Sequence, residues 1–234
     1  MDKALEKELD VWAYPYLEAR DTFSVLKMIE LPPSGELVNA YADAAITTML
    51  RGVILEVCIA AEELRVPRTP PSTTPCPACG RGPKTPAKGR FGKALLAHAD
   101  TVTRNPWEGR SVNEEPTPLE AKEEFWAAYD RLFPDVAKRS ATTPTRDDIA
   151  DLSEQFSRVV EPLRNHRNTM IAHKRPKQVV VGLEAVDKCI AEVDRLVRDV
   201  EFVLSGGAVT GSSVGTFSDE EAFAAKMSAL LLTP

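Results

Sequence analysis

The sequence predicts an all-α protein, and three observations lead to this prediction. Apolar residues recur at steps of three, four or seven along most of the 234 residues, which is the period of an amphipathic helix. No segment shows the alternating apolar and polar pattern of a half-buried strand. Aromatic residues make up only 6% of the chain, whereas Ala, Leu, Glu and Val are common. We therefore expect a bundle of four or five long helices, together with shorter ones.

Two helices are predicted before the first proline-rich stretch. The first carries an apolar stripe over residues 5–26; Pro15 is expected to kink or interrupt it, and the prolines at 32–33 end it. Ser34 is suited to cap the second helix, which is apolar on most faces between Met49 and Ala61. Such a helix usually lies at the centre of a bundle.

Four further helices are predicted near residues 91–99, 118–132, 146–173 and 182–204. Thr145 is suited to cap the third of these helices. Pro162 lies inside it and indicates either a kink or a restart with proline in the first turn. The glycine pair that follows Leu204 stops the last of the four.

These helices are expected to form one domain over residues 1–204. An irregular insertion interrupts it at about 67–117, where residues 67–90 alone hold seven prolines. From Leu64 to Ala99 there are seven Lys and Arg but no Asp or Glu, so the insertion is basic. Residues 205–234 are expected to be a flexible linker followed by a short C-terminal helix.

The composition excludes several classes of protein. A net charge of −6 excludes a globally basic nucleic-acid binder, but a local basic patch remains compatible with it. No apolar run approaches the length of about 18 residues that a transmembrane helix requires, and the charged N-terminus lacks a signal core. Four cysteines are too few for a disulfide scaffold. We therefore expect a cytoplasmic protein with no membrane partner.

The candidate functional site is a basic segment that contains two of the chain's three histidines. Between Arg158 and Lys177 there are six Lys or Arg residues and a single acid, Glu161. A basic cluster on an acidic protein is a candidate phosphate site. By charge alone, the commoner interpretation is a solvated helix end, where cations complement the helix dipole.

The order of residues in this segment resembles a known motif. Arg167-Asn168, four further residues and then His173 resemble the motif of the HEPN superfamily, all-helical domains of many prokaryotic toxins and defence proteins. The pattern R-N-x-x-I-A-H-K is most similar to the abortive-infection, AbiU-like branch. The resemblance extends over about residues 1–66 and 118–204 and implies a HEPN-like helical bundle.

The resemblance also implies an activity. In that family the Arg and the His, with a polar residue after the Arg, form a metal-independent ribonuclease site, and two protomers usually pair around one shared cleft. Carried over, Arg167 and His173 are expected to be catalytic and Asn168 to support them. The remaining polar residues of the segment are expected to bind RNA; they are Arg164, His166, Lys174, Arg175 and Lys177.

The spacing of the two catalytic candidates adds a geometric condition. Six residues at about 100° each place Arg167 and His173 roughly 120° apart on a straight helix. Convergence on one phosphate therefore requires a helix that ends near Ala172 or a second protomer. We accordingly expect a homodimer formed through the helix that contains residues 147–173.

One position departs from part of the superfamily. Some of its toxins carry a tyrosine two residues after the His, which a partner nucleotidyltransferase modifies. Arg175 stands at that position here, so the sequence gives no support for this form of control.

The insertion carries a second candidate site. Cys76 and Cys79 have the C-x-x-C spacing of half a tetrahedral zinc site, so structural zinc is one interpretation. Cys58 and Cys189 lie in predicted apolar helices and are not expected to supply the missing ligands, which leaves His98 or a second protomer. Two free loop thiols, or a redox dithiol, are the alternatives.

Two hypotheses of function follow. The first is a metal-independent endoribonuclease of a toxin or anti-phage defence system, which cleaves RNA by attack of the ribose 2′-OH and needs no cofactor for catalysis. Such a protein would act with an antitoxin or another defence partner. The alternative is a non-catalytic helical module that uses the same basic cluster to bind RNA, a nucleotide or a protein partner.

Overall fold

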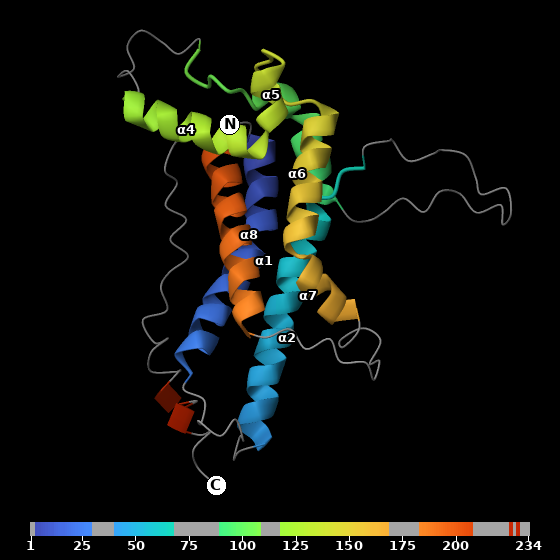
Figure 1. Ribbon diagram of the computed structural model, residues 1–234, viewed down its shortest axis with the longest axis vertical. Helices are drawn as coiled ribbons and strands as arrows, with labels where there is room; N and C mark the ends of the chain where they lie inside the picture. The colour runs from blue at the N-terminus through green and yellow to red at the C-terminus, as the bar shows by residue number, and fades with distance from the viewer. Residues whose placement is uncertain are drawn as a thin grey trace, which may run out of the picture. The chain divides into compact units, whose positions relative to one another are not determined.

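The computed structural model describes residues 3–29, 40–67, 89–108, 118–168, 183–207, 225–226 and 228–229, and nine helical elements are assigned in it (Figure 1). The elements are α1 (Lys3–Met28), α2 (Ala40–Glu63), α3 (Arg90–Ala97), the 3-10 helix η1 (Ala99–Thr101), α4 (Leu119–Leu132), α5 (Pro134–Lys138), α6 (Arg146–Val159), α7 (Glu161–His166) and α8 (Leu183–Leu204). The described residues contain no strand, which confirms the all-α prediction for this part of the chain.

The chain divides into two compact units, which we describe separately. Unit 1 consists of Met1–Trp12, Ala61–Val159 and Val193–Thr210. Unit 2 consists of Ala13–Ala60, Val160–Glu192 and Gly211–Pro234. Each of α1, α2 and α8 supplies residues to both units.

Pro15 does not interrupt the first helix, because α1 runs from Lys3 to Met28 with Pro15 inside it. A proline removes the N–H that would bond to the carbonyl four residues earlier, here that of Val11. Val11 is 49% exposed, so water can reach this part of the helix and solvate the carbonyl.

The core of unit 1 forms around Trp12. Its ring stacks on Phe91 of α3, with 4.4 Å between ring centroids and 9° between planes. Phe156 of α6 meets the same ring edge-on at 5.7 Å. The apolar stripes predicted for these helices therefore face one another, as the helical period requires.

The start of α3 lies directly against the end of α2. A Cβ atom on Gly92 would lie only 2.4 Å from the carbonyl oxygen of Leu64, so no larger residue fits there without a shift. Glu63 accepts a hydrogen bond from the N–H of Arg90 at 3.0 Å, and the Arg90 guanidinium pairs with both carboxylate oxygens of Glu8. These contacts hold in place the residues on either side of the segment 68–88, which lie at the end of α2 and the start of α3.

The predicted cap of α6 and the predicted stop of α8 are both confirmed. Thr145 Oγ1 accepts the N–H of Asp148, whose carboxylate accepts the N–H of Thr145, which is a reciprocal capping box. Gly206 and Gly207 adopt positive φ angles of 71° and 82°. The N–H of Gly207 bonds to the carbonyl of Phe202, which ends α8 in the manner usual for glycine.

Unit 2 is built on the middle of α1, most of α2 and the first part of α8. The Tyr16 hydroxyl is buried and donates a hydrogen bond of 3.0 Å to the carbonyl of Ile190. Cys58 of α2 and Cys189 of α8 are buried free thiols, as their apolar helices predicted. Burial raises the pKa of Cys189 to about 12, and the neighbouring Cys58 contributes in the same direction.

Among the residues that the structure describes, one helix qualifies by length and composition to cross a membrane. The segment Ala44–Glu63 has 20 residues; an 18-residue window within it has a mean hydropathy of 1.7, and 33% of that window is buried. The sequence-based prediction of no such helix considered only uninterrupted apolar runs. This segment contains the charged residues Arg51 and Glu56, so it is not such a run. Length and composition do not separate a membrane-crossing helix from the core helix of a soluble protein.

Candidate functional site

The candidate site begins where the helix predicted over 146–173 breaks. α6 ends at Val159, Val160 adopts φ −89° and ψ 0°, and α7 starts at Glu161. Pro162 lies in the first turn of α7, where its missing N–H would have no intrahelical partner. The structure thus selects a restart over a kink for Pro162.

Leu163 fixes which side of α7 faces the interior of unit 2. Its side chain is fully buried, with 0% exposure, as is that of Val160. Arg167 follows four residues later, so it lies about 40° from Leu163 around the helix axis. Arg167 is accordingly half-buried, whereas Asn165, on the opposite side, is exposed.

Arg167 and Asn168 contact each other directly. The Nε–H and Nη2–H groups of Arg167 both point to Asn168 Oδ1, each at 3.3 Å. Both residues have π-helical geometry directly after α7, at the edge of the residues that the structure describes. Because Asn168 is neutral, this contact orients the guanidinium without itself bringing a negative charge beside it.

The structure places only part of the predicted site. Arg164 and His166 are half-buried on α7 beside Arg167, and Asn168 is exposed. His173, Lys174, Arg175 and Lys177 lie outside the described residues, so their position relative to Arg167 stays a prediction. What the described part offers is a cation held by an amide at a helix end, which is suited to a phosphate group.

The second candidate site also lies outside the described residues, since Cys76 and Cys79 fall in the segment 68–88. No group of three or more His, Cys, Asp or Glu residues with the arrangement of a metal site occurs among the residues described. Zinc at these cysteines therefore stays a prediction.

The exposed side of α6 is polar. Ile149, Leu152 and Phe156 are at most 1% exposed, and Val159 at the end of the helix is half-buried. The residues that α6 presents to solvent include Arg146, Asp147, Glu154 and Arg158. The homodimer expected through residues 147–173 stays a prediction, and over α6 its contacts would be between charged groups.

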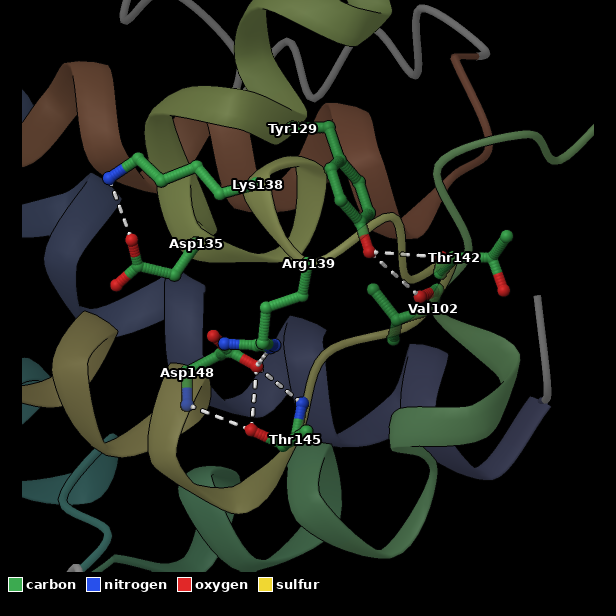
Figure 2. Close-up of polar contacts among 8 residues, drawn as sticks. All are labelled: Val102, Tyr129, Asp135, Lys138, Arg139, Thr142, Thr145 and Asp148. Atoms are coloured by element: carbon green, nitrogen blue, oxygen red, sulfur yellow. Dashed lines mark hydrogen bonds and ion pairs between the residues drawn. The ribbon is translucent and has the colours of Figure 1, made fainter.

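A second polar cluster surrounds the buried carboxylate of Asp148 in unit 1 (Figure 2). Asp148 Oδ2 accepts hydrogen bonds from Arg139 Nη2 at 2.5 Å, Thr145 N at 2.6 Å and Thr145 Oγ1 at 2.7 Å. Burial raises the pKa of Asp148, but these hydrogen bonds outweigh burial and hold it below its ordinary value. The cluster caps α6 and is a structural element.

Tyr129 completes this region in Figure 2. Its hydroxyl points to the carbonyl oxygens of Thr142 and Val102, at 3.2 and 3.4 Å. Burial, together with the charge of Asp148, raises the pKa of Tyr129 well above its ordinary value, so the phenol stays a neutral donor. The sequence analysis did not single out Asp148, although Thr145-x-x-Asp148 is a capping-box pattern.

Comparison of the chain with known protein families, with curated proteins and with solved structures gives no match.

Proposed function

We propose that this protein is a metal-independent, HEPN-like endoribonuclease that acts in the cytoplasm as part of a toxin or anti-phage defence system. The observation that supports this proposal is the position of Arg167. Arg167 lies one helical turn after buried Leu163, and the neutral amide oxygen of Asn168 orients its guanidinium. The resemblance of Arg167-Asn168 and His173 to the HEPN motif supplies the chemistry.

In the proposed reaction the ribose 2′-OH attacks the adjacent phosphorus and the bond to the 5′-oxygen breaks. The products are a 2′,3′-cyclic phosphate and a 5′-OH. Arg167 would hold two phosphate oxygens with its planar, permanently charged fork as negative charge develops on them. His173 would accept the proton of the 2′-OH or protonate the leaving 5′-oxygen, because imidazole exchanges protons near neutral pH.

The experiment that tests the proposal is incubation of the purified protein with total RNA in EDTA. Cleavage that persists in the chelator, with cyclic phosphate at the new 3′ ends, is the expected result. Arg167→Ala and His173→Ala should each lower the rate by roughly 100-fold or more, the usual effect of losing a charge-stabilising or proton-transfer group. Arg167→Lys should restore little activity, because an ammonium lacks the fork.

Arg164→Ala and His166→Ala are the matched controls, since both residues lie half-buried on the same short helix. They should lower RNA affinity more than the rate of cleavage. If these variants lose cleavage while Arg167→Ala keeps full activity, the catalytic residues have been assigned to the wrong positions of the segment. RNA binding without cleavage in the wild-type protein would leave the non-catalytic binding module as the function.

A further inference from the structure

Arg164 and Arg167 lie one helical turn apart at the end of α7. The N–H of Arg167 bonds to the carbonyls of Leu163 and Arg164, and Arg167 itself keeps helical angles of φ −52° and ψ −48°. Side chains three positions apart on a helix are neighbours, with about 5–6 Å between their Cβ atoms. Both arginines are half-buried, so two guanidinium groups leave the helix from adjacent positions.

The angular order around the helix places an amide beside these two cations. At about 100° per residue, Arg164 lies roughly 60° from Arg167, and Asn168 lies roughly 40° beyond Arg164. Asn168 Oδ1 accepts the two hydrogen bonds of 3.3 Å from Arg167. His166 lies roughly 100° from Arg167 in the opposite direction. One side of the helix thus carries two guanidinium groups and an amide, and His166 lies outside it.

The charges on this side of the helix repel each other. Like charges three or four residues apart destabilise a helix, and half-burial of both arginines lowers the screening by water and salt. The amide that orients Arg167 is neutral and brings no negative charge to it. Glu161, the acid of α7, is exposed and lies roughly 120° from Arg167. An anion with two negative charges about one helical turn apart would turn this repulsion into attraction.

We propose that Arg164 and Arg167 bind two successive phosphates of one RNA strand; this inference rests on the proposed function, because it takes RNA as the substrate. Arg167 holds the phosphate that is cleaved, and Arg164 holds the phosphate next to it along the strand. Arg164 is therefore a positioning residue, which fixes the strand relative to the reacting phosphate. The substrate class is an RNA strand with at least two successive phosphodiester groups.

Charge and spacing favour two phosphodiester groups over other anions. A single phosphodiester carries one negative charge, so it would leave one of the two cations unmatched. The two phosphoryl groups of a pyrophosphate share a bridging oxygen, which holds them closer together than one helical turn. Successive phosphates of RNA are separated by a whole sugar. That longer separation suits guanidinium groups that leave the helix one turn apart, each with a fork for its own phosphate.

The salt dependence of RNA binding counts the phosphates that the arginines contact. The probe is a fluorescent hexamer of 2′-O-methyl RNA, which lacks the attacking hydroxyl and is not cleaved. Its association constant with the full chain would be measured by fluorescence anisotropy over a range of salt concentrations. For single strands, the logarithm of this constant falls with the logarithm of the salt concentration, with a slope of about −0.7 for each phosphate contacted.

Arg164→Gln and Arg167→Gln should each reduce the size of this slope by about 0.7, and the double variant should reduce it by about 1.4. Each single change should also weaken binding at low salt by about ten-fold or more, the usual effect of losing a hydrogen bond to a charged group. Arg195→Gln, on an exposed position of α8, is the matched control and should leave the slope unchanged. Circular dichroism checks that every variant keeps its helix content.

A second measurement tests whether the two phosphates are successive. In a DNA strand that contains one ribonucleotide, the single 2′-OH determines which phosphate is cleaved. A methylphosphonate at the next phosphate on either side removes the charge of that neighbour. At one of these two positions it should lower kcat/KM of the wild type by about ten-fold or more. The same methylphosphonate should have little further effect in Arg164→Gln, as expected when the two changes remove one shared contact.

Three results would overturn this inference. The first is a slope for the double variant equal to that of Arg167→Gln, which would mean that both arginines hold one phosphate or that Arg164 holds none. The second is a methylphosphonate effect that persists in Arg164→Gln at both positions. The third is displacement of the hexamer by inorganic pyrophosphate at micromolar concentration, which would identify a nucleotide as the ligand. The expected slopes without cleavage of the ribonucleotide strand would instead overturn the proposed ribonuclease function and leave the two phosphate contacts standing.

Discussion

At the scale of single residues, Asp148 shows how one carboxylate organises its surroundings. It is only 3% exposed, and it accepts hydrogen bonds from Arg139 and from two groups of Thr145. Asp148→Ala removes a helix cap together with a charge-assisted bond, so we expect a loss of about 2–4 kcal/mol in the free energy of unfolding. Urea denaturation at neutral pH measures it.

The same residue predicts a dependence on pH. Because the pKa of Asp148 is lowered in the folded protein, its contribution is complete above the ordinary carboxyl pKa of about 4 and is lost as the pH falls through the folded-state value. Asp148→Asn keeps the shape but cannot ionise. The stability difference between the wild type and this variant should therefore shrink on acidification; a difference that stays constant down to pH 2 would contradict the assignment.

Residue-scale reasoning from the sequence predicted Arg167 as a site residue but did not predict its local surroundings. The motif named Arg167 and Asn168, whereas their direct contact depends on the restart of the helix after Val160, which the sequence left open against a kink at Pro162. Asp148 shows the reverse case. A carboxylate three residues after a capping threonine is a local signal. The arginine that completes the cluster, Arg139, lies just after α5 and nine residues before Asp148, so the local pattern does not include it.

At the scale of elements, the long helices could be predicted because each buries one continuous stripe. Thr145 as a cap and Gly206-Gly207 as a stop were predicted because both act within a few residues. The short helix α5, Pro134–Lys138, was missed, since five residues with a single buried side chain, Val136, show no period. Its formation depends on packing against its neighbours, and the sequence does not show that packing.

Two glycines on neighbouring elements should respond in opposite ways to alanine. Gly92→Ala on α3 places a methyl group 2.4 Å from the Leu64 carbonyl oxygen, so we expect a net loss of about 1–3 kcal/mol despite the better helix propensity. Gly52→Ala on α2 meets open space and should raise stability by about 0.5–1 kcal/mol. Thermal unfolding at high dilution measures both, and stabilisation by Gly92→Ala would show that α3 packs differently.

At the scale of the whole molecule, the unfolding of the two units can be followed separately, because tryptophan residues report on one unit and buried cysteine residues on the other. All three tryptophans, Trp12, Trp107 and Trp126, belong to unit 1, whereas the buried thiols Cys58 and Cys189 belong to unit 2. Burial holds the pKa of Cys189 near 12, so this thiol reacts only when unit 2 opens. A variant with Cys76→Ser and Cys79→Ser leaves these two thiols as the only ones in the chain.

Unfolding of this variant in urea should be a single event. Because α1, α2 and α8 each supply residues to both units, loss of either unit removes the packing that supports helices of the other. Tryptophan fluorescence and the reaction of the two thiols with a colorimetric disulfide should therefore give the same midpoint, which is the usual criterion for two-state unfolding. Thiol reaction at a clearly lower urea concentration would instead mean that unit 2 opens by itself and that the shared helices do not couple the units.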